Sequence, residues 1–352
     1  MSDWNCENNF MDNLKFILFN PKLDENKAKI AEEFLESEQL RFVDTVELTL
    51  IVLKNKEIIA SGSLDGDVLK CFAIRKDFRK KGLTNKLLMI LTEEAYKNNN
   101  THLFIYTKPE NCELFESLGY HKIIAVSELV VLMENKSNGF KKYLDELKKY
   151  KSSNKKVTSI VMNCNPFTNG HLFLVEKAAK ENDVVHIFVL TEDRSEFSSS
   201  DRINMVKAGT RHIENVIIHP AGKYIISSAT FPSYFIKDKG NIVKAHAFLD
   251  LTLFSKYIAK AIGIKSRYIG EEPYSNLTKE YNYYMKEILP EYGVEVIEVK
   301  RKEFNGEAIS ASKVRELLKE RNFDEVYNLV PKTTFDYLMK IIWFWEVFYH
   351  GN

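Results

Sequence analysis

The segment NPFTNGH, residues 165–171, holds the residue types of a phosphate-binding turn. It follows the hydrophobic run Val157–Cys164, whose β-branched residues predict a buried strand. The proline ends that strand, because it lacks an N–H and disfavours helix at its predecessor. Thr168 is then a candidate N-cap for the helix HLFLVEKAAK, and Gly170 allows close approach of a ligand. With free N–H groups at the helix start, Thr168 and His171 could donate hydrogen bonds to a phosphoryl group.

A second segment, ISASKVR at residues 309–315, has complementary chemistry. Ser310 and Ser312 stand at a predicted helix start, and Arg315 follows one turn later. Hydroxyls, N–H groups and a guanidinium together form a cradle for an anion. Each segment alone is also compatible with an ordinary capped helix that carries a solvated arginine or histidine. The pair in this order favours one shared nucleotide site.

The elements between the two segments alternate between strand and helix. Such alternation predicts an α/β fold, a Rossmann-like parallel sheet with helices on both faces. Ligands bind such sheets at the carboxyl ends of the strands, where both segments fall. The expected strands are VVHIFVL (184–190), NVIIH (215–219), RYIG (267–270) and VEVIEV (294–299), and the expected helices include INMVKAGTRHI, LTLFSKYIAKAIGI and LTKEYNYYMKEIL.

Length and composition fit a two-domain globular protein. The chain has 352 residues, 45% hydrophobic and 28% charged. Lys and Arg number 50 against 49 Asp and Glu, so no bulk charge points to nucleic acid or membrane. Four widely spaced cysteines and the absence of a secretory n-region and h-region predict a reduced, cytoplasmic protein.

The expected domain bounds are 1–135, a connector at 136–156, 157–338 and an aromatic tail at 339–352. The connector is polar and Lys-rich, with an amphipathic helix expected in its middle. The run YLMKIIWFWEVFYHGN (337–352) is too short for a bilayer span of about 20 apolar residues. A terminal helix docked on the core or on a second copy is expected there; shallow membrane contact is the alternative.

In the N-terminal domain, the run CFAIRKDFRKKGLTNKLLMILTEEA (71–95) predicts a strand that leads through Arg79, Lys81 and Gly82 into an apolar helix. This order resembles the GNAT acetyltransferase fold, an α+β fold. This run is similar to the GNAT loop whose N–H groups hold the pyrophosphate of coenzyme A. Thr84 stands where the family usually has Gly or Ala. A second run, NCELFESLGYHKI (111–123), resembles the fold's other signature.

The pair TxGH and ISxSxxR resembles the nucleotidyltransferase superfamily. A GNAT-like domain placed before such a domain, together with GKYIISSATFPSYFIKD (222–238), residues 271–315 and LVPKTTFDYL (329–338), is similar to the citrate lyase ligase family over about residues 15–338. The resemblance implies an AMP-forming acid–thiol ligase that uses ATP, with Mg²⁺, and acetate. Acetate would be activated as acetyl-adenylate and passed to the CoA-derived prosthetic thiol of the citrate lyase acyl carrier subunit, which activates citrate lyase and releases AMP and diphosphate.

The resemblance also assigns roles to residues. His171 and Thr168 would act at the α-phosphate, and Ser310, Ser312 and Arg315 at the β- and γ-phosphates. Further contacts to ATP are expected from Asn165, Phe167, Gly170, Arg202, Gly270 and Ile309. Arg202 in SSSDRINM is alternatively a solvated surface residue, and Gly270 with Glu271 and Glu272 either lines the adenine pocket or forms a plain turn. Arg79, Lys81 and Gly82 would hold the CoA-like group.

Two other functions remain open on the sequence alone. One is a cofactor-biosynthesis adenylyltransferase with the same motifs; the other is a CoA-dependent acetyltransferase or a regulator that only binds nucleotide. The chain has no GxxxxGK(S/T), GxSxG or HExxH motif and no histidine pair with metal-ligand spacing. We therefore expect no protein-held metal centre.

Overall fold

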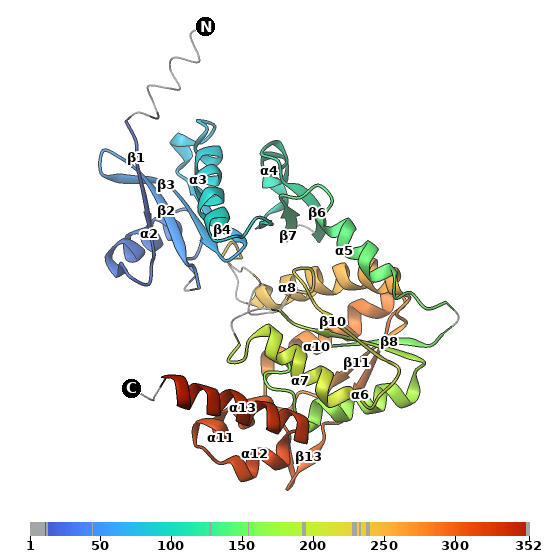
Figure 1. Ribbon diagram of the computed structural model, residues 1–352. Helices are drawn as coiled ribbons and strands as arrows, with labels where there is room; N and C mark the ends of the chain where they lie inside the picture. The colour runs from blue at the N-terminus through green and yellow to red at the C-terminus, as the bar shows by residue number, and fades with distance from the viewer. Residues whose placement is uncertain are drawn as a thin grey trace. The chain divides into compact units, whose positions relative to one another are not determined.

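In the computed structural model, the described residues are 11, 13–43, 45–126, 129–153, 155–191, 195–226, 231, 234–236 and 240–349, apart from the side chains of 240, 241 and 344–349. The chain forms two compact units. The first comprises residues 1–141 with 231–245, and the second comprises 142–230 with 246–352 (Figure 1). No helix within the described part of the chain is long and apolar enough to cross a membrane.

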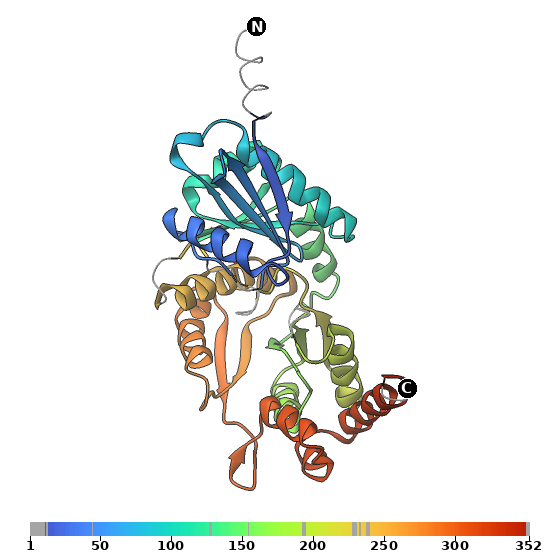
Figure 2. The ribbon, with the colours of Figure 1, turned by 90° about the vertical axis from the view of Figure 1, so that its left-hand side faces the viewer.

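The first unit is built on a seven-stranded sheet in the order β1-β2-β3-β4-β5-β7-β6. Alternate residues of β2 face opposite sides, so Ile51 packs with α2 while Leu50 and Val52 pack with α3 (Figure 2). Both faces of the sheet are therefore covered. The elements are β1 (Lys15–Phe19), α2 (Glu25–Ser37), β2 (Leu48–Lys54), β3 (Glu57–Asp65), β4 (Val68–Ile74), η1 (Lys76–Phe78), α3 (Leu83–Lys97), β5 (Phe104–Thr107), η2 (Pro109–Asn111), α4 (Cys112–Ser117), β6 (His121–Val126) and β7 (Val130–Glu134).

Strands β4 and β5 are parallel but part after two paired positions, Val68 with Phe104 and Leu69 with Ile105. The described residues of segment 231–236 pack against β5 beyond these paired positions. The hydroxyl of Tyr234 donates to the carbonyl of Tyr106 at 2.9 Å, and the ring of Phe231 meets that of Tyr106 edge-on. A distant stretch of chain thus completes this unit.

The second unit contains a five-stranded, all-parallel sheet in the order β10-β9-β8-β11-β12. Its inner strand β9, VVHIFV, is mostly apolar and buried along its whole length, as expected for a strand covered on both faces. The expected α/β class and all four expected strands after β8 are confirmed. The elements are α5 (Gly139–Lys148), β8 (Val157–Met162), α6 (Asn169–Glu181), β9 (Val184–Val189), α7 (Ser199–Thr210), β10 (Val216–Pro220), α8 (Gly240–Leu253), the π-helical turn η3 (Phe254–Ala259), α9 (Lys260–Ile262), β11 (Ser266–Gly270), α10 (Asn276–Glu291), β12 (Glu295–Val299), β13 (Glu303–Phe304), β14 (Glu307–Ala308), α11 (Ala311–Lys319), α12 (Phe323–Leu329) and α13 (Lys332–Tyr349).

Helices cover both faces of this sheet (Figure 1). One core joins β8, β9 and β11 to α6, α7, α11 and α12, through residues such as Val175 and Met205. The other core joins the sheet to α5, α8 and α10, through residues such as Leu147 and Leu251. The strand order reverses between β8 and β11. A crevice at the carboxyl ends of these two strands is the expected ligand site of such a sheet.

Helices α5 and α13 lie at the two ends of the second unit. Helix α5, in the predicted connector, contributes Tyr143, Leu144 and Leu147 to the second core. Helix α13 runs without a break from Lys332 into the predicted tail, and the Tyr337 hydroxyl donates to Asp201 at 2.8 Å. Its first turns are therefore part of the folded unit.

A buried histidine pair joins β9 to β10. His186 Nδ1 lies 2.8 Å from His219 Nε2, and the residues are 0% and 5% exposed. Burial, joined for His186 by the charge of His219, lowers the pKa of both to about 4. The unfolded chain, with histidine pKa near 6.5, then binds more protons than the native state between pH 6.5 and 4.

We therefore expect the second unit to lose stability as the pH falls through that window. Urea unfolding at pH 7.5, 6 and 5 would show a falling midpoint. In His219→Gln the fall should be smaller. The exposed His212→Gln variant is the matched control, and an equal slope in all three proteins would contradict the assignment.

Candidate active site

The loop after β8 places the first motif at the carboxyl edge of the sheet, beside the switch point. Thr168 is the N-cap of α6, with its hydroxyl accepting from the backbone N–H of His171 at 3.3 Å. In return, the backbone N–H of Thr168 donates to Nδ1 of His171 at 3.0 Å. The side chains thus form a capping box that fixes the imidazole over the helix start.

This geometry determines which ring nitrogen of His171 carries the proton. Because Nδ1 accepts a hydrogen bond, the neutral ring carries its hydrogen on Nε2. Protein atoms surround the ring, although part of the residue stays accessible. This burial, together with the charge of Arg301, lowers the pKa of His171 to about 4. Near neutral pH the ring is therefore an uncharged donor through Nε2.

The ring of Phe167 stacks on the imidazole of His171. The Phe167 ring is fully buried, with its centroid 5.8 Å from that of His171 and the planes 12° apart. The other side of the ring meets α7 at Gly209, where a Cβ atom would lie 2.6 Å from Cε1 of Phe167. Only a residue without a side chain fits there.

Replacing Gly209 with Ala is therefore expected to shift Phe167 and its neighbour His171. Overpacking of this kind costs about 1–3 kcal/mol. Chemical denaturation of Gly209→Ala should show a loss of that size. The double variant with Phe167→Leu should recover part of it, and a fully stable single variant would refute the packing argument.

The second motif meets the first. Ser310 is the N-cap of α11, and Arg315 on this helix donates from Nη1 to the backbone carbonyl of Asn165 at 2.6 Å. Arg315 Nη2 also donates to Ser312 Oγ at 3.2 Å. A Cβ atom on Gly170 would lie 3.3 Å from the carbonyl oxygen of Ile309. The two segments are thus in contact at the start of α6.

Arg202 is not on the surface. It is fully buried, and its guanidinium donates to the carbonyls of Leu190 at 2.7 Å, Asn163 at 3.1 Å and Phe197 at 3.1 Å. The solvated alternative is therefore wrong. These contacts tie the end of β9 to the loop after β8, which favours a positioning role; direct contact with a nucleotide stays a prediction.

The loop after β11 is held by Arg301, which follows β12. Arg301 donates to the carbonyl of Glu271 and pairs with Glu272, both at 2.6 Å. This arginine, in a basic run of the sequence, is closely engaged, whereas Lys300 is exposed and pairs with Glu303. Gly270 ends β11, and its carbonyl accepts from Asn282 at 3.2 Å. An adenine contact at Gly270 remains a prediction.

Sequence patterns did not single out Glu196. Its Oε2 lies 3.6 Å from Nε of Arg315 and 3.8 Å from Nζ of Lys319. The residue stands in a polar stretch without periodicity, so no local signal marks it. It orients the arginine of the second motif.

In the first unit, the candidate CoA-binding loop begins α3. Gly82 is the N-cap with φ of +76°, a left-handed conformation that favours glycine. Arg79 donates to the carbonyl of Ile74 and pairs with Glu38, each at 3.0 Å. Lys81 lies 4.9 Å from the centroid of the Phe78 ring. A role of this loop toward a CoA-like group remains a proposal.

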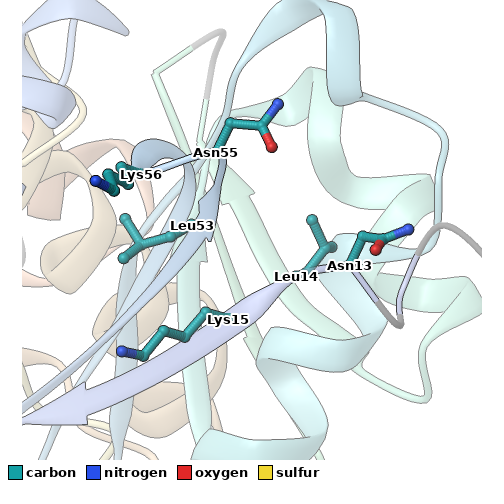
Figure 3. Close-up of a pocket in the computed structure, with 6 residues that line it drawn as sticks. All are labelled: Asn13, Leu14, Lys15, Leu53, Asn55 and Lys56. Carbon is teal, nitrogen blue, oxygen red and sulfur yellow. The ribbon is translucent and has the colours of Figure 1, made fainter.

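A hollow of about 390 Å³ also lies in the first unit (Figure 3). It is lined by Asn13, Leu14, Lys15, Leu53, Asn55 and Lys56. The lining residues include two lysines but no carboxylate, thiol, hydroxyl or imidazole, so the hollow suggests no catalytic chemistry.

The parallel sheet with the TxGH turn, joined to a unit of the GNAT type, defines a nucleotidyltransferase-like class of protein. Residues 157–338 match the citrate lyase ligase C-terminal domain, and residues 20–131 match the acetyltransferase (GNAT) domain. The citrate (pro-3S)-lyase ligase of Klebsiella pneumoniae is 39% identical over 322 residues, covering 90% of this chain and 94% of that protein.

A second relative, the citrate (pro-3S)-lyase ligase of Escherichia coli K12, is 39% identical over 328 residues, covering 91% of this chain and 93% of its own. The phosphopantetheine adenylyltransferase of Symbiobacterium thermophilum is 38% identical over 66 residues only, 18% of this chain and 41% of that protein. The chain belongs to the citrate lyase ligase family. It is accordingly an enzyme of the ligase class.

Proposed function

We propose that this enzyme acetylates the prosthetic-group thiol of the citrate lyase acyl carrier subunit, at the expense of ATP and acetate. The observation that carries the proposal is the contact between Arg315 and the carbonyl of Asn165, since it joins both phosphate-binding segments into one site. Family membership over nine-tenths of the chain supports the same activity.

In the first step, a carboxylate oxygen of acetate attacks the α-phosphorus of ATP. The bond from that phosphorus to the bridging oxygen breaks, and diphosphate leaves with the electron pair. Negative charge is carried by the phosphoryl oxygens, which positioned donors stabilise. Nε2–H of His171 and the N–H groups at the start of α6 serve the α-phosphate. Arg315, Ser310 and Ser312 hold the departing diphosphate.

The low pKa of His171 suits this role, because a neutral ring donates one defined hydrogen bond and needs no proton exchange. Mg²⁺ enters the proposal bound to the phosphate oxygens of ATP, its preferred mode with nucleotides. Among the described residues no cluster of three or more His, Cys, Asp or Glu side chains could hold a metal ion. We assign no step to the ion.

In the second step, the thiolate of the carrier attacks the acyl carbon of acetyl-adenylate. The C–S bond forms, the bond to the adenylyl oxygen breaks, and AMP leaves. The first unit would hold the CoA-like arm of the carrier at the start of α3. Its support is the helix N-terminus capped by Gly82 and the basic residues before it.

We expect Lys81→Glu to raise KM for the carrier roughly fivefold, about 1 kcal/mol for one exposed charge. KM for ATP should not change. Substitutions at Gly82 test this less cleanly, because φ of +76° strains any other residue. Lys29→Glu on α2 is the matched charge reversal. Equal effects of the two variants would refute the assignment of the loop.

Exchange of labelled diphosphate into ATP tests the proposed reaction itself. We expect exchange that depends on acetate. An adenylyltransferase of cofactor biosynthesis would need a phosphate-bearing acceptor instead, and a CoA-dependent acetyltransferase would show no exchange. Absence of acetate-dependent exchange in the folded enzyme would overturn the proposal.

A further inference from the structure

Arg267 on β11 carries a buried positive charge whose hydrogen-bonding capacity is largely unused. The residue is 4% exposed, and neither Nε nor Nη1 has a hydrogen-bond partner. These two atoms carry three of the five N–H bonds of a guanidinium. In the part of the chain that the structure describes, no carboxylate lies within 4.0 Å of it. Such a charge is costly unless an anion completes it.

The carboxylate of Asp250, which shares the partner Tyr281 with Arg267, is already engaged. Asp250 on α8 accepts from the backbone N–H of Ile226 at 2.7 Å through Oδ1, and from the Tyr281 hydroxyl through Oδ2. That hydroxyl lies between Asp250 and Arg267, and both influence its pKa, which burial raises. The Asp250–Tyr281 pair therefore orients the guanidinium without neutralising its free edge.

The rest of the surroundings is apolar. The guanidinium lies 4.8 Å from the centroid of the Phe254 ring. On the other side of the cluster, His246 stacks on Tyr281 with centroids 5.3 Å apart. One positive group among aromatic rings matches a small anion with an apolar end, such as a short carboxylate, whose charge meets the N–H groups and whose methyl group meets a ring.

The backbone of Arg267 lies near the amino end of β11, where it pairs with Ser159 of β8, whereas the residues around its side chain connect to the carboxyl edge of the sheet, where the candidate site is. Asn282, next to Tyr281, donates to the carbonyl of Gly270, the last residue of β11. Ile226 follows β10, whose exit is fixed by the hydrogen bond from Ala221 to the carbonyl of Val189 at the end of β9. Strand β11 also pairs with β8, and the first motif follows the carboxyl end of β8.

We propose that Arg267 binds the carboxylate of the acid substrate, with the Asp250–Tyr281 pair positioning its guanidinium. This inference rests on the proposed function and deepens it, since it assigns a group that selects a short monocarboxylate. The carboxylate oxygen that Arg267 does not hold is the nucleophile toward the α-phosphorus. No protein group changes its protonation state in this step.

The test is a pair of variants, Arg267→Met and Arg267→Lys, in the full chain. In diphosphate exchange, Arg267→Met should raise KM for acetate at least tenfold and leave KM for ATP within twofold. Arg267→Lys, which keeps the charge but not the planar group, should show a smaller rise. Arg211→Met, at an exposed arginine of the same unit, should change neither constant.

Direct titration with ¹³C-acetate, followed by NMR without ATP, gives a second readout. Wild type should bind acetate and Arg267→Met should not. Unfolding by urea should show Arg267→Met at least as stable as wild type, because an unpaired buried charge is removed. If that variant does not fold, Arg267→Lys and Tyr281→Phe take its place in both assays.

An unchanged KM for acetate in a folded Arg267 variant would overturn the proposal. So would an equal rise in KM for ATP, which would assign the arginine to a phosphate, the other anion of the site. Absence of acetate-dependent diphosphate exchange in the wild-type enzyme, in contrast, would contradict the proposed function. Acetate binding by titration would still decide whether Arg267 holds a carboxylate, so the two failures are distinguishable.

Discussion

His171→Ala should lower acetate-dependent diphosphate exchange by about 10²–10³-fold, the loss typical for one preorganised donor to a developing oxyanion. The fall should be in kcat more than in KM for ATP, because Nε2–H of His171 is aimed at charge that grows during the reaction. His171→Gln, which offers an amide N–H at a similar reach, should retain part of the activity. The exchange rate at saturating acetate measures this.

The same substitution also removes half of a capping box, since Nδ1 accepts from the backbone of Thr168. That loss alone costs roughly 0.5–2 kcal/mol of stability. Asn322→Ala, which deletes the N-cap of α12, is the matched control with a similar loss and no expected change in exchange. If both variants lost activity equally, the role of His171 would be structural.

The pH dependence of exchange gives an independent check. With its pKa lowered to about 4, His171 remains neutral from pH 6 to 8, so its titration should leave no inflection there. An inflection near pH 6.5 that vanished in His171→Gln would show that the ring titrates in the working range. It would contradict a neutral donor.

The fold of the second unit was predictable because the local sequence preferences agree with the requirements of tertiary packing there. A strand covered on both faces needs a mostly apolar run, and VVHIFV of the inner strand β9, buried along its whole length, is such a run. Thr168 was predictable as an N-cap because the proline ahead of it ends a strand and a helical pattern follows. Those signals lie within a few residues of each other. The carboxyl-edge location then followed from the topology of parallel sheets.

Other features depend on partners that no local pattern reveals. Segment 231–236 joins the first unit through the contacts of Tyr234 with Tyr106, although more than a hundred residues separate them. Arg202 stands in a polar stretch that suggests solvent exposure, yet it is buried and its guanidinium donates to three backbone carbonyls. Gly209 is required only because the ring of Phe167 arrives from another element. Each depends on a tertiary contact.

Arg315→Met should lower kcat/KM for ATP about 10²-fold. The guanidinium makes a charge-assisted bond to the carbonyl of Asn165, and contacts of this kind contribute about 1.5–3 kcal/mol. Loss of its charge toward the diphosphate adds to that. Lys319→Met is the matched control. Lys319 lies on the same helix as Arg315 and also pairs with Glu196, but it is largely exposed. This control variant should change kcat/KM less than twofold.

A double variant, His171→Ala with Arg315→Met, decides whether the two motifs act on one triphosphate. Groups that stabilise one transition state and share a loop couple, so the combined loss should fall short of the product of the single losses. Arg315 holds the loop that carries His171, and its removal displaces the imidazole before the second substitution is made. Losses that multiplied would mean that the two segments bind separate ligands, and a shared site would then be untenable.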